Sequence, residues 1–370
     1  MSTLTKIPRF ATKLTNALLN PYMPNYIIFY VTSVCNARCR MCFYWESIET
    51  HDKSKELSFE QIEKLSHSFK NLIQVTLTGG EPFLRDELPE IVRAYYKNSG
   101  AMFFAIPTNG YLPDRQIPMV RQILKNAPNA RIEIALSLDG TEEIHDYIRK
   151  VPGGYKKLKE TYKELKKLKK EYSNLIVTSC STLSMLNLDN MKENIDDLMT
   201  NWEFDKSTIL LCRGNPKEPS VREVSINDYI KMTEYIKSFP QRVKQYEFSK
   251  VFKGMSKTMM KTLATTVKED KEVNPCLAGK KLLIVYQNGD VYPCEIIDVI
   301  HPEAIKGGFF LGNVRDYDMN ITKLLSNDKT KEVLDFIKRE KCHCSFECAL
   351  FASMVFNPKT YPQIIKESFV

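Results

Sequence analysis

The sequence lacks any apolar run that is long enough to cross a bilayer. The longest such stretches, of which Ala349 to Phe356 is an example, fall well short of the roughly 20 residues that a spanning helix needs. The N-terminus also lacks the basic region, apolar block and cleavage site of a secretory signal. A chain of 370 residues with 43 % hydrophobic content can bury a full core, so we expect a folded cytoplasmic protein with one large and one smaller domain.

A large excess of charge of one sign is also missing. The formal net charge is +8, and many lysines lie on an expected solvated helix face between residues 155 and 172. No interleaved aromatic platform or nucleic-acid motif accompanies them. The composition therefore argues against a nucleic-acid partner.

The sequence does contain ten cysteines, which would suggest disulfides only in a small secreted chain. Because this chain is large and has no secretory signal, metal ligation or catalysis is the better interpretation. Eight of the ten fall into two groups, at residues 35–42 and 276–348. The other two, Cys180 and Cys212, sit in apolar strand-like runs, where we expect buried structural thiols.

Strand-like and helix-like runs alternate six times along the first 240 residues. Strands are expected at residues 27–32, 73–78, 101–107, 131–138, 175–181 and 207–212. Helices are expected at about residues 58–70, 86–98, 115–126, 155–172, 188–201 and 225–238. This order predicts an α/β fold built as a partial (β/α)6 TIM-type barrel, with a small α+β domain at its C-terminal side.

We divide the chain into four parts. An amphipathic segment at residues 1–22 is expected to pack on its own domain and precedes the barrel at 23–240. A basic, Met-rich linker helix follows at 241–273, and the small domain takes up 274–370. That domain opens with a predicted hairpin around Asn288-Gly289.

The candidate ligand, binding and catalytic residues follow the predicted strands. Chemistry in such barrels occurs at the carboxyl ends of the strands, which meet at one rim. Four strands are followed there by Cys35, Cys39 and Cys42, by Gly79-Gly80-Glu81-Pro82, by Thr108-Asn109-Gly110, and by Ser137, Asp139 and Gly140.

Three thiolates in one short loop suit an iron-sulfur cluster or a zinc ion. A closed zinc site needs a fourth Cys or His ligand, and none follows Cys42 until His51. A cubane with three protein ligands would instead keep one iron open for a substrate or cofactor. The spacing of the cysteines alone does not decide between a zinc ion and an iron-sulfur cluster.

The cysteine triplet, the Gly-Gly-Glu-Pro turn and the barrel order together resemble the radical S-adenosylmethionine (SAM) superfamily over residues 27 to about 212. The resemblance implies a [4Fe-4S] cluster whose open iron chelates SAM. It also implies reductive cleavage of SAM to a 5′-deoxyadenosyl radical that abstracts a substrate hydrogen. A reducing electron donor such as flavodoxin or ferredoxin is implied as a partner.

The resemblance assigns roles to individual positions. Met41 departs from the pattern, since many members carry an aromatic residue before the last cysteine; a bulky apolar side chain is kept. The implied cluster ligands are Cys35, Cys39 and Cys42; the implied site for the SAM amino group is Gly79, Gly80 and Glu81; the implied ribose contacts are Asn109, Ser137 and Asp139; the implied partner of the SAM carboxylate is Arg149.

The C-terminal cysteines resemble the SPASM or twitch extension of that superfamily, which makes the small domain an iron-sulfur domain. Five cysteines are available here, fewer than the seven or more that a full SPASM domain uses for two clusters. We therefore predict one auxiliary [4Fe-4S] cluster, with a zinc site as the alternative. The predicted ligands are Cys276, Cys294 and Cys348, with the fourth drawn from Cys342 or Cys344.

Two carboxylates accompany this cysteine group. Glu295 directly follows Cys294, and Asp290 sits at the hairpin turn. Because the small domain should close over the barrel mouth, either carboxylate could face substrate as an acid or base, and we predict Glu295 as the catalytic one.

The substrate class is only weakly indicated. About 25 residues precede the first strand, too few for the winged-helix leader-binding module of many peptide maturases, which favours a small-molecule, glycan-linked or lipid-linked substrate. A peptide-modifying maturase is the alternative, and a non-catalytic iron-sulfur redox or scaffold protein is the alternative of another class. Segments 6–19, 251–268 and 349–356 further suggest a surface for peripheral membrane contact.

Overall fold

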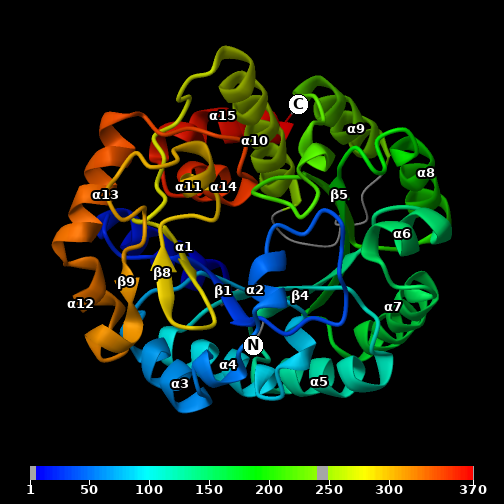
Figure 1. Ribbon diagram of the computed structural model, residues 1–370, viewed down its shortest axis with the longest axis horizontal. Helices are drawn as coiled ribbons and strands as arrows, with labels where there is room; N and C mark the ends of the chain where they lie inside the picture. The colour runs from blue at the N-terminus through cyan, green and yellow to red at the C-terminus, as the bar shows by residue number, and fades with distance from the viewer. Residues whose placement is uncertain (1–5, 240–248, 370) are drawn as a thin grey trace.

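The fold is described from a computed structural model over residues 6–239 and 249–369. A nine-stranded sheet in the order β6-β5-β4-β3-β2-β1-β7-β8-β9 forms its centre (Figure 1). β1 to β7 pair in parallel, and β8 and β9 add antiparallel strands at the far edge. The strands are β1 Tyr26–Thr32, β2 Gln74–Gly79, β3 Phe103–Thr108, β4 Arg131–Ser137, β5 Leu175–Leu183, β6 Lys206–Leu211, β7 Leu282–Val285, β8 Asp290–Tyr292 and β9 Gly312–Asn313.

Helices alternate with the first six strands and lie outside them (Figure 1), so the predicted partial barrel is confirmed. Two helices that the sequence did not predict, α2 Trp45–Glu49 and α6 Glu142–Arg149, lie within loops at the rim. The six predicted helices are α3 Phe59–Ser68, α4 Leu88–Ala94, α5 Pro113–Asn126, α7 Gly154–Glu171, α8 Met191–Asn201 and α9 Ile226–Ser238.

The N-terminal helix α1 (Lys6–Leu19) packs on the protein, as its amphipathic pattern predicted. The Phe10 ring meets Phe103 edge to face at 6.2 Å between centroids, and Ala17 is fully buried. Lys13 Nζ donates to the Leu72 carbonyl at 2.9 Å. Residues 1–5 of the predicted segment lie outside the described residues.

The linker forms the helix α10 (Ser249–Glu269), with Leu263 fully buried; residues 241–248 of the prediction lie outside the described ranges. The predicted hairpin is present as β7 and β8, with Gly289 at a φ of +90° in its turn. The remaining helices are α11 Ile297–Ile300, α12 Ile321–Leu325, α13 Asp328–Arg339, α14 Glu347–Val355 and α15 Tyr361–Phe369.

The prediction of a membrane-facing surface at residues 349–356 is wrong. Ala352 is fully buried, and Met354 and Phe356 are 1 % and 7 % exposed, because α14 packs in the core beside the sheet. None of the described helices combines the length and the apolar character that a membrane span requires.

The hairpin joins the barrel through β1, where Ile27 pairs with Leu283. Lys281, just before β7, donates from Nζ to the Asn20 carbonyl at 2.7 Å and to Asn25 Oδ1 at 3.0 Å. One sheet therefore runs through both predicted domains, and the division of the chain into domains stays a prediction.

The two faces of the barrel strands differ in burial. Along β4, Ile132, Ile134 and Leu136 face the helices and are buried, whereas Ala135 and Ser137 point to the other side and are partly exposed. β3 shows the same alternation. The inner face of the barrel is therefore lined by side chains that solvent reaches.

Candidate functional site

The first cysteine group forms a tight loop after β1. The Cys42 amide donates to the Cys39 carbonyl at 3.2 Å, and the Ala37 amide donates to Cys35 Sγ at 3.4 Å. Burial, together with the neighbouring thiols, raises the pKa of Cys35 and of Cys42 to about 12. The three sulfurs thus lie within electrostatic reach of one another in a partly desolvated loop.

The Gly-Gly turn after β2 lies directly beneath this loop. A Cβ at Gly79 would stand 2.2 Å from the Thr32 carbonyl oxygen, and one at Gly80 would stand 2.1 Å from that of Val34. The Gly80 amide donates to Thr32 O at 2.9 Å, and the Glu81 amide donates to Val34 O at 2.8 Å. The two glycines therefore allow backbone contact that positions the cysteine loop.

The Glu81 carboxylate is buried and already bonded. Its oxygens accept from Thr108 Oγ1 at 2.7 Å and from the amides of Asn109 and Phe83 at 2.9 and 3.2 Å. Burial raises its pKa, while these hydrogen bonds lower it. Glu81 thus ties the end of β3 to the turn, and the Asn109 side-chain amide reaches the cysteine loop through Asn36 Oδ1 at 2.7 Å.

Asp139 and Arg149 form a buried pair beside Cys39. Asp139 Oδ2 accepts from Arg149 Nε and Nη2 at 2.5 Å each, and Asp139 Oδ1 accepts from the Thr182 amide. Arg149 Nη1 lies 3.7 Å from Cys39 Sγ. Burial alone would lower the pKa of Arg149, but Asp139 and Cys39 raise it, so the guanidinium stays charged. Nη1 is the nitrogen that faces the loop, and nearby Ser137 is partly exposed on the inner face.

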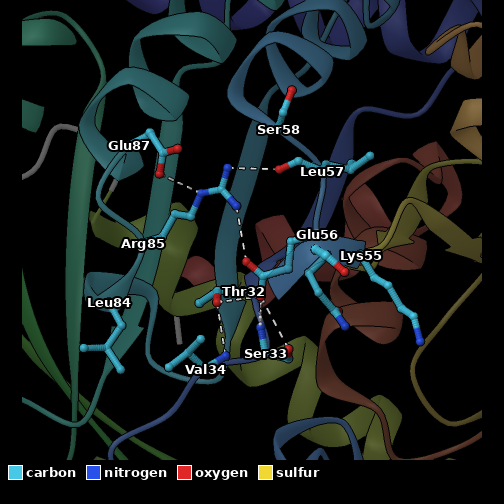
Figure 2. Close-up of polar contacts among 12 residues, drawn as sticks. Thr32, Ser33, Val34, Lys55, Glu56, Leu57, Ser58, Leu84, Arg85 and Glu87 are labelled. Atoms are coloured by element: carbon cyan, nitrogen blue, oxygen red, sulfur yellow. Dashed lines mark hydrogen bonds and ion pairs between the residues drawn. The ribbon is translucent and has the colours of Figure 1, made fainter. Parts of the chain in front are cut away.

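A second buried ion pair braces the start of the same loop (Figure 2). Glu56 Oε1 accepts from Thr32 Oγ1 and from the Ser33 amide, both at 2.8 Å. Arg85, which follows the Gly-Gly-Glu-Pro turn, lies 3.3 Å from Glu56 Oε2 and donates to the Leu57 carbonyl at 3.0 Å. The pair therefore joins the cysteine loop to the glycine turn.

The segment around Glu56 also contacts the second half of the chain. The Leu57 amide donates to the Gln287 carbonyl at 2.6 Å. Arg315 Nη2 donates to the carbonyls of Lys55 and Glu56 at 3.0 and 3.2 Å. The hairpin that precedes Cys294 is thus fixed to the segment that braces the first cysteine loop.

Tyrosines fill the space between the two cysteine groups. Tyr30 of β1 packs against Tyr44 and Tyr286 at centroid distances of 4.6 and 4.7 Å, and Tyr286 meets Tyr292 edge to face at 5.5 Å. Tyr44 follows Cys42 by two positions, and Tyr292 precedes Cys294 by two. The two groups are therefore connected by packed aromatic side chains.

Four thiols of the second group act on one another electrostatically. Cys276 and Cys342 share a hydrogen bond that lowers the pKa of Cys276 and raises that of Cys342. Burial raises the pKa of Cys294 well above its usual value, and the thiols of Cys344 and Cys276 raise it further. Cys276, Cys294, Cys342 and Cys344 thus lie within electrostatic reach of one another.

Cys348 has charged and polar neighbours of another kind. Burial raises its pKa to about 12, and the groups that act on its thiol are Arg213, Glu295, Tyr26 and Glu347. It is the second residue of α14 and is partly exposed. These surroundings favour Cys342 and Cys344 together in place of the Cys348 that the spacing suggested, and the ligand set stays a prediction.

The two predicted carboxylates have different surroundings. Glu295 is 4 % exposed in its side chain and accepts from the Tyr30 hydroxyl at 2.7 Å. Asp290 accepts from Asn288 and Asn313 at 2.6 and 2.8 Å within the hairpin turn. Asp290 thus shapes the turn, and Glu295 is the one that reaches the barrel.

The two cysteine groups differ in how the chain supplies them. Cys35, Cys39 and Cys42 come from one loop, whereas the second group comes from three separate segments of the chain. Among the described residues, no three His, Cys, Asp or Glu side chains are gathered closely enough to hold one metal ion. The identity of the metal group at either place therefore stays a prediction.

Sequence reasoning missed the charged residues that support these loops. Glu56 and Arg85 are 8 % and 7 % exposed although each lies in a polar stretch of sequence. Arg213 and Glu347, which pair at 2.6 Å, were also missed, although both lie beside apolar or cysteine residues. The position of Arg213 two residues after the end of β6, at the rim, was the one feature that could have marked it as a site residue.

Comparison with known proteins supports this arrangement. Residues 29–198 match the family model of the Radical SAM superfamily. A GTP 3',8-cyclase of Edwardsiella ictaluri is 34 % identical over 134 residues, which is 35 % of this chain and 39 % of that enzyme. The molybdenum cofactor biosynthesis protein 1 of Mus musculus is 29 % identical over 146 residues, 36 % of this chain and 23 % of that protein. The match thus spans well under half the length of these relatives.

Solved structures share the fold over most of the chain. The structure of native anSMEcpe with bound AdoMet has a TM-score of 0.57 at 18 % identity and covers 94 % of this chain and 96 % of that one. Streptococcus suis SuiB bound to precursor peptide SuiA has a TM-score of 0.58 at 13 % identity, covering 91 % and 71 %. At 18 % and 13 % identity, these similarities show a shared fold alone.

Proposed function

We propose that this chain is an enzyme of the radical SAM superfamily, whose family model matches residues 29–198. The proposal is reductive cleavage of SAM followed by hydrogen abstraction from an organic substrate inside the barrel. The observation that carries it is the cysteine loop, which is hydrogen-bonded to the Gly79-Gly80 turn and faced by the Arg149 guanidinium.

Cys35, Cys39 and Cys42 would hold the first [4Fe-4S] cluster. When bound there, the cluster and SAM supply a 5′-deoxyadenosyl radical. Arg149 Nη1 lies 3.7 Å from Cys39 Sγ, and its guanidinium would pair with the SAM carboxylate. Asn109 and Ser137 remain the proposed ribose contacts, and Asp139 orients Arg149.

The second cysteine group is proposed to hold one auxiliary [4Fe-4S] cluster. Its ligands would be Cys276, Cys294, Cys342 and Cys344, because these four thiols influence one another. Cys348 then serves in packing at the start of α14.

Glu295 is proposed to act as an acid or base at the substrate. The Tyr30 hydroxyl donates a hydrogen bond of 2.7 Å to the Glu295 carboxylate and orients it. Glu295 also directly follows Cys294 in the chain. A proton released by the substrate would be held at Glu295 Oε2, the oxygen that Tyr30 leaves unoccupied.

A small-molecule, glycan-linked or lipid-linked substrate is the first candidate. A peptide is the second, because the solved structures that align over most of this chain include one described with a precursor peptide. The fold by itself does not decide between the two.

The test is SAM cleavage by anaerobically reconstituted, dithionite-reduced protein. We expect 5′-deoxyadenosine by mass spectrometry, a loss of the product in Cys39→Ala, and its retention in Cys212→Ala, a matched buried thiol. Absence of 5′-deoxyadenosine together with no effect of SAM on the electron paramagnetic resonance (EPR) signal of the reduced cluster would overturn the proposal.

A further inference from the structure

A buried ion cluster lies where the open edge of the barrel sheet meets α14. Arg213 follows β6, and its Nη1 lies 2.6 Å from Glu347 Oε2, at the first residue of α14. Arg213 Nη2 lies 3.5 Å from Glu295 Oε2, and Tyr30 of β1 donates to the other Glu295 oxygen. Four segments that are distant in sequence thus place polar atoms at one point.

Glu347 holds Arg213 in a fixed orientation. Its Oε1 accepts from the Leu211 amide, at the edge of β6, and from the Tyr229 hydroxyl, both at 3.2 Å. The Arg213 guanidinium carbon lies 4.6 Å from the centre of the Phe346 ring. With one face on an aromatic ring and one nitrogen on Glu347, the guanidinium cannot turn freely.

Two atoms of the cluster are buried without a hydrogen-bond partner among the described residues. They are Arg213 Nε, a donor, and Glu295 Oε2, an acceptor. Both atoms belong to the side chains of one ion pair, in which Arg213 Nη2 lies 3.5 Å from Glu295 Oε2. Buried polar atoms are nearly always paired, so a donor and an acceptor without hydrogen bonds in one ion pair point to a ligand group that supplies both partners.

These atoms border the inner face of the barrel. Tyr30, which contacts Glu295, pairs in register with Thr78, and Thr78 is partly exposed on that face. Cys180 of β5 lies within electrostatic reach of both Asp139 and Glu347, so the ion cluster and the Asp139-Arg149 pair lie on either side of this thiol. A ligand between the two would lie within the barrel.

The charge of the cluster narrows the class of ligand. One guanidinium faces two carboxylates, which leaves an excess negative charge that repels a phosphate or carboxylate. An ammonium group would pair with Glu295 but leave Arg213 Nε open and bring two cations together. A neutral group that both donates and accepts satisfies both atoms.

We infer that Arg213 and Glu295 anchor a hydroxyl or amide group of the substrate and that Glu347 positions Arg213. The group donates to Glu295 Oε2 and accepts from Arg213 Nε. This inference rests on the proposed function, because it names the substrate class of the same barrel.

Thermal unfolding of the reconstituted protein with three probes tests the inference. The probes are myo-inositol for hydroxyls, N-acetylglycinamide for amides, and GTP for a triphosphate. We expect one neutral probe to raise the unfolding temperature with its concentration. Its dissociation constant should weaken about 10-fold or more in Glu295→Gln and in Arg213→Lys, since each loses a hydrogen bond with a charged group. The exposed Glu171→Gln serves as the unchanged control.

Three results would overturn the inference: no stabilisation by either neutral probe, equal stabilisation in the wild type and both variants, or stabilisation by GTP that Arg213→Lys abolishes. The two neutral probes distinguish a polyol from a peptide-like substrate. The measurement needs no SAM cleavage. Probe binding without 5′-deoxyadenosine formation would therefore count against the proposed function alone.

Discussion

Glu56→Gln tests whether a residue outside the cysteine loop controls the first cluster. The glutamine keeps the shape and one acceptor for Thr32 and Ser33 but removes the charge opposite Arg85. Breaking a buried ion pair on one side costs about 3–5 kcal/mol. Arg85 keeps Leu57 O and Glu87 as partners, each at 3.0 Å, so we expect a loss of about 2–3 kcal/mol in the free energy of unfolding.

Glu56→Gln should disturb the first cysteine loop as well as lower the global stability. The Glu56 carboxylate bonds to Thr32 and Ser33, which immediately precede the loop of Cys35, and to Arg85, which follows the glycine turn. We expect iron to fall from about eight toward about four atoms per chain, with the EPR signal of the first cluster lost and that of the auxiliary cluster retained. Urea unfolding of the same samples gives the stability change.

The control is Glu87→Gln, which removes the partly exposed partner of Arg85 and should change stability by less than about 1 kcal/mol. Full iron content and unchanged unfolding in Glu56→Gln would refute the reasoning. An equal loss of both clusters would show that the pair acts only through global stability.

Three further changes have defined outcomes. Cys344→Ala should lose about four irons per chain while Cys348→Ala keeps them, and iron analysis showing the reverse would restore the ligand set suggested by spacing. Gly80→Ala should fail to load the first cluster because its Cβ would stand 2.1 Å from a carbonyl oxygen; normal EPR would contradict this. Burial lowers the pKa of His145 to about 3, so as pH falls below about 6.5 only the unfolded chain takes up its proton, and stability should fall by up to about 1.4 kcal/mol per pH unit. His145→Gln should remove that slope in urea titrations between about pH 5 and 6.5.

The alternation of strands and helices was predictable because each element shows its own hydrophobic period. All six barrel strands and their helices appear near the expected residues. α6 was missed although Ile144, Tyr147 and Ile148 form an apolar stripe, because its eight residues are too few to stand out between two turns. The extra strand β7 could be recognised as a hairpin strand, but its parallel pairing with β1 is a long-range property that no local pattern encodes.

The candidate site was predictable where it depends on residue spacing and not where it depends on packing. Cys35, Cys39 and Cys42 stand out in the sequence, whereas Glu56 resembles any surface glutamate until its burial is known. The same limit applies to Cys348. Its spacing from Cys344 suggests a ligand, whereas its charged and polar neighbours Arg213 and Tyr26 are known only from the fold.

The pairing of β7 with β1 has a consequence for how the protein is made. During synthesis β1 leaves the ribosome early, but its outer edge has no partner until residues 282–285 follow, and Lys281 and Asn25 are 256 residues apart. An N-terminal fragment would expose this apolar strand edge, which favours aggregation. The Leu57 to Gln287 hydrogen bond likewise forms only late, so the first cysteine loop is fully braced only in a nearly complete chain. Soluble expression should therefore require the hairpin, and cluster insertion should follow translation.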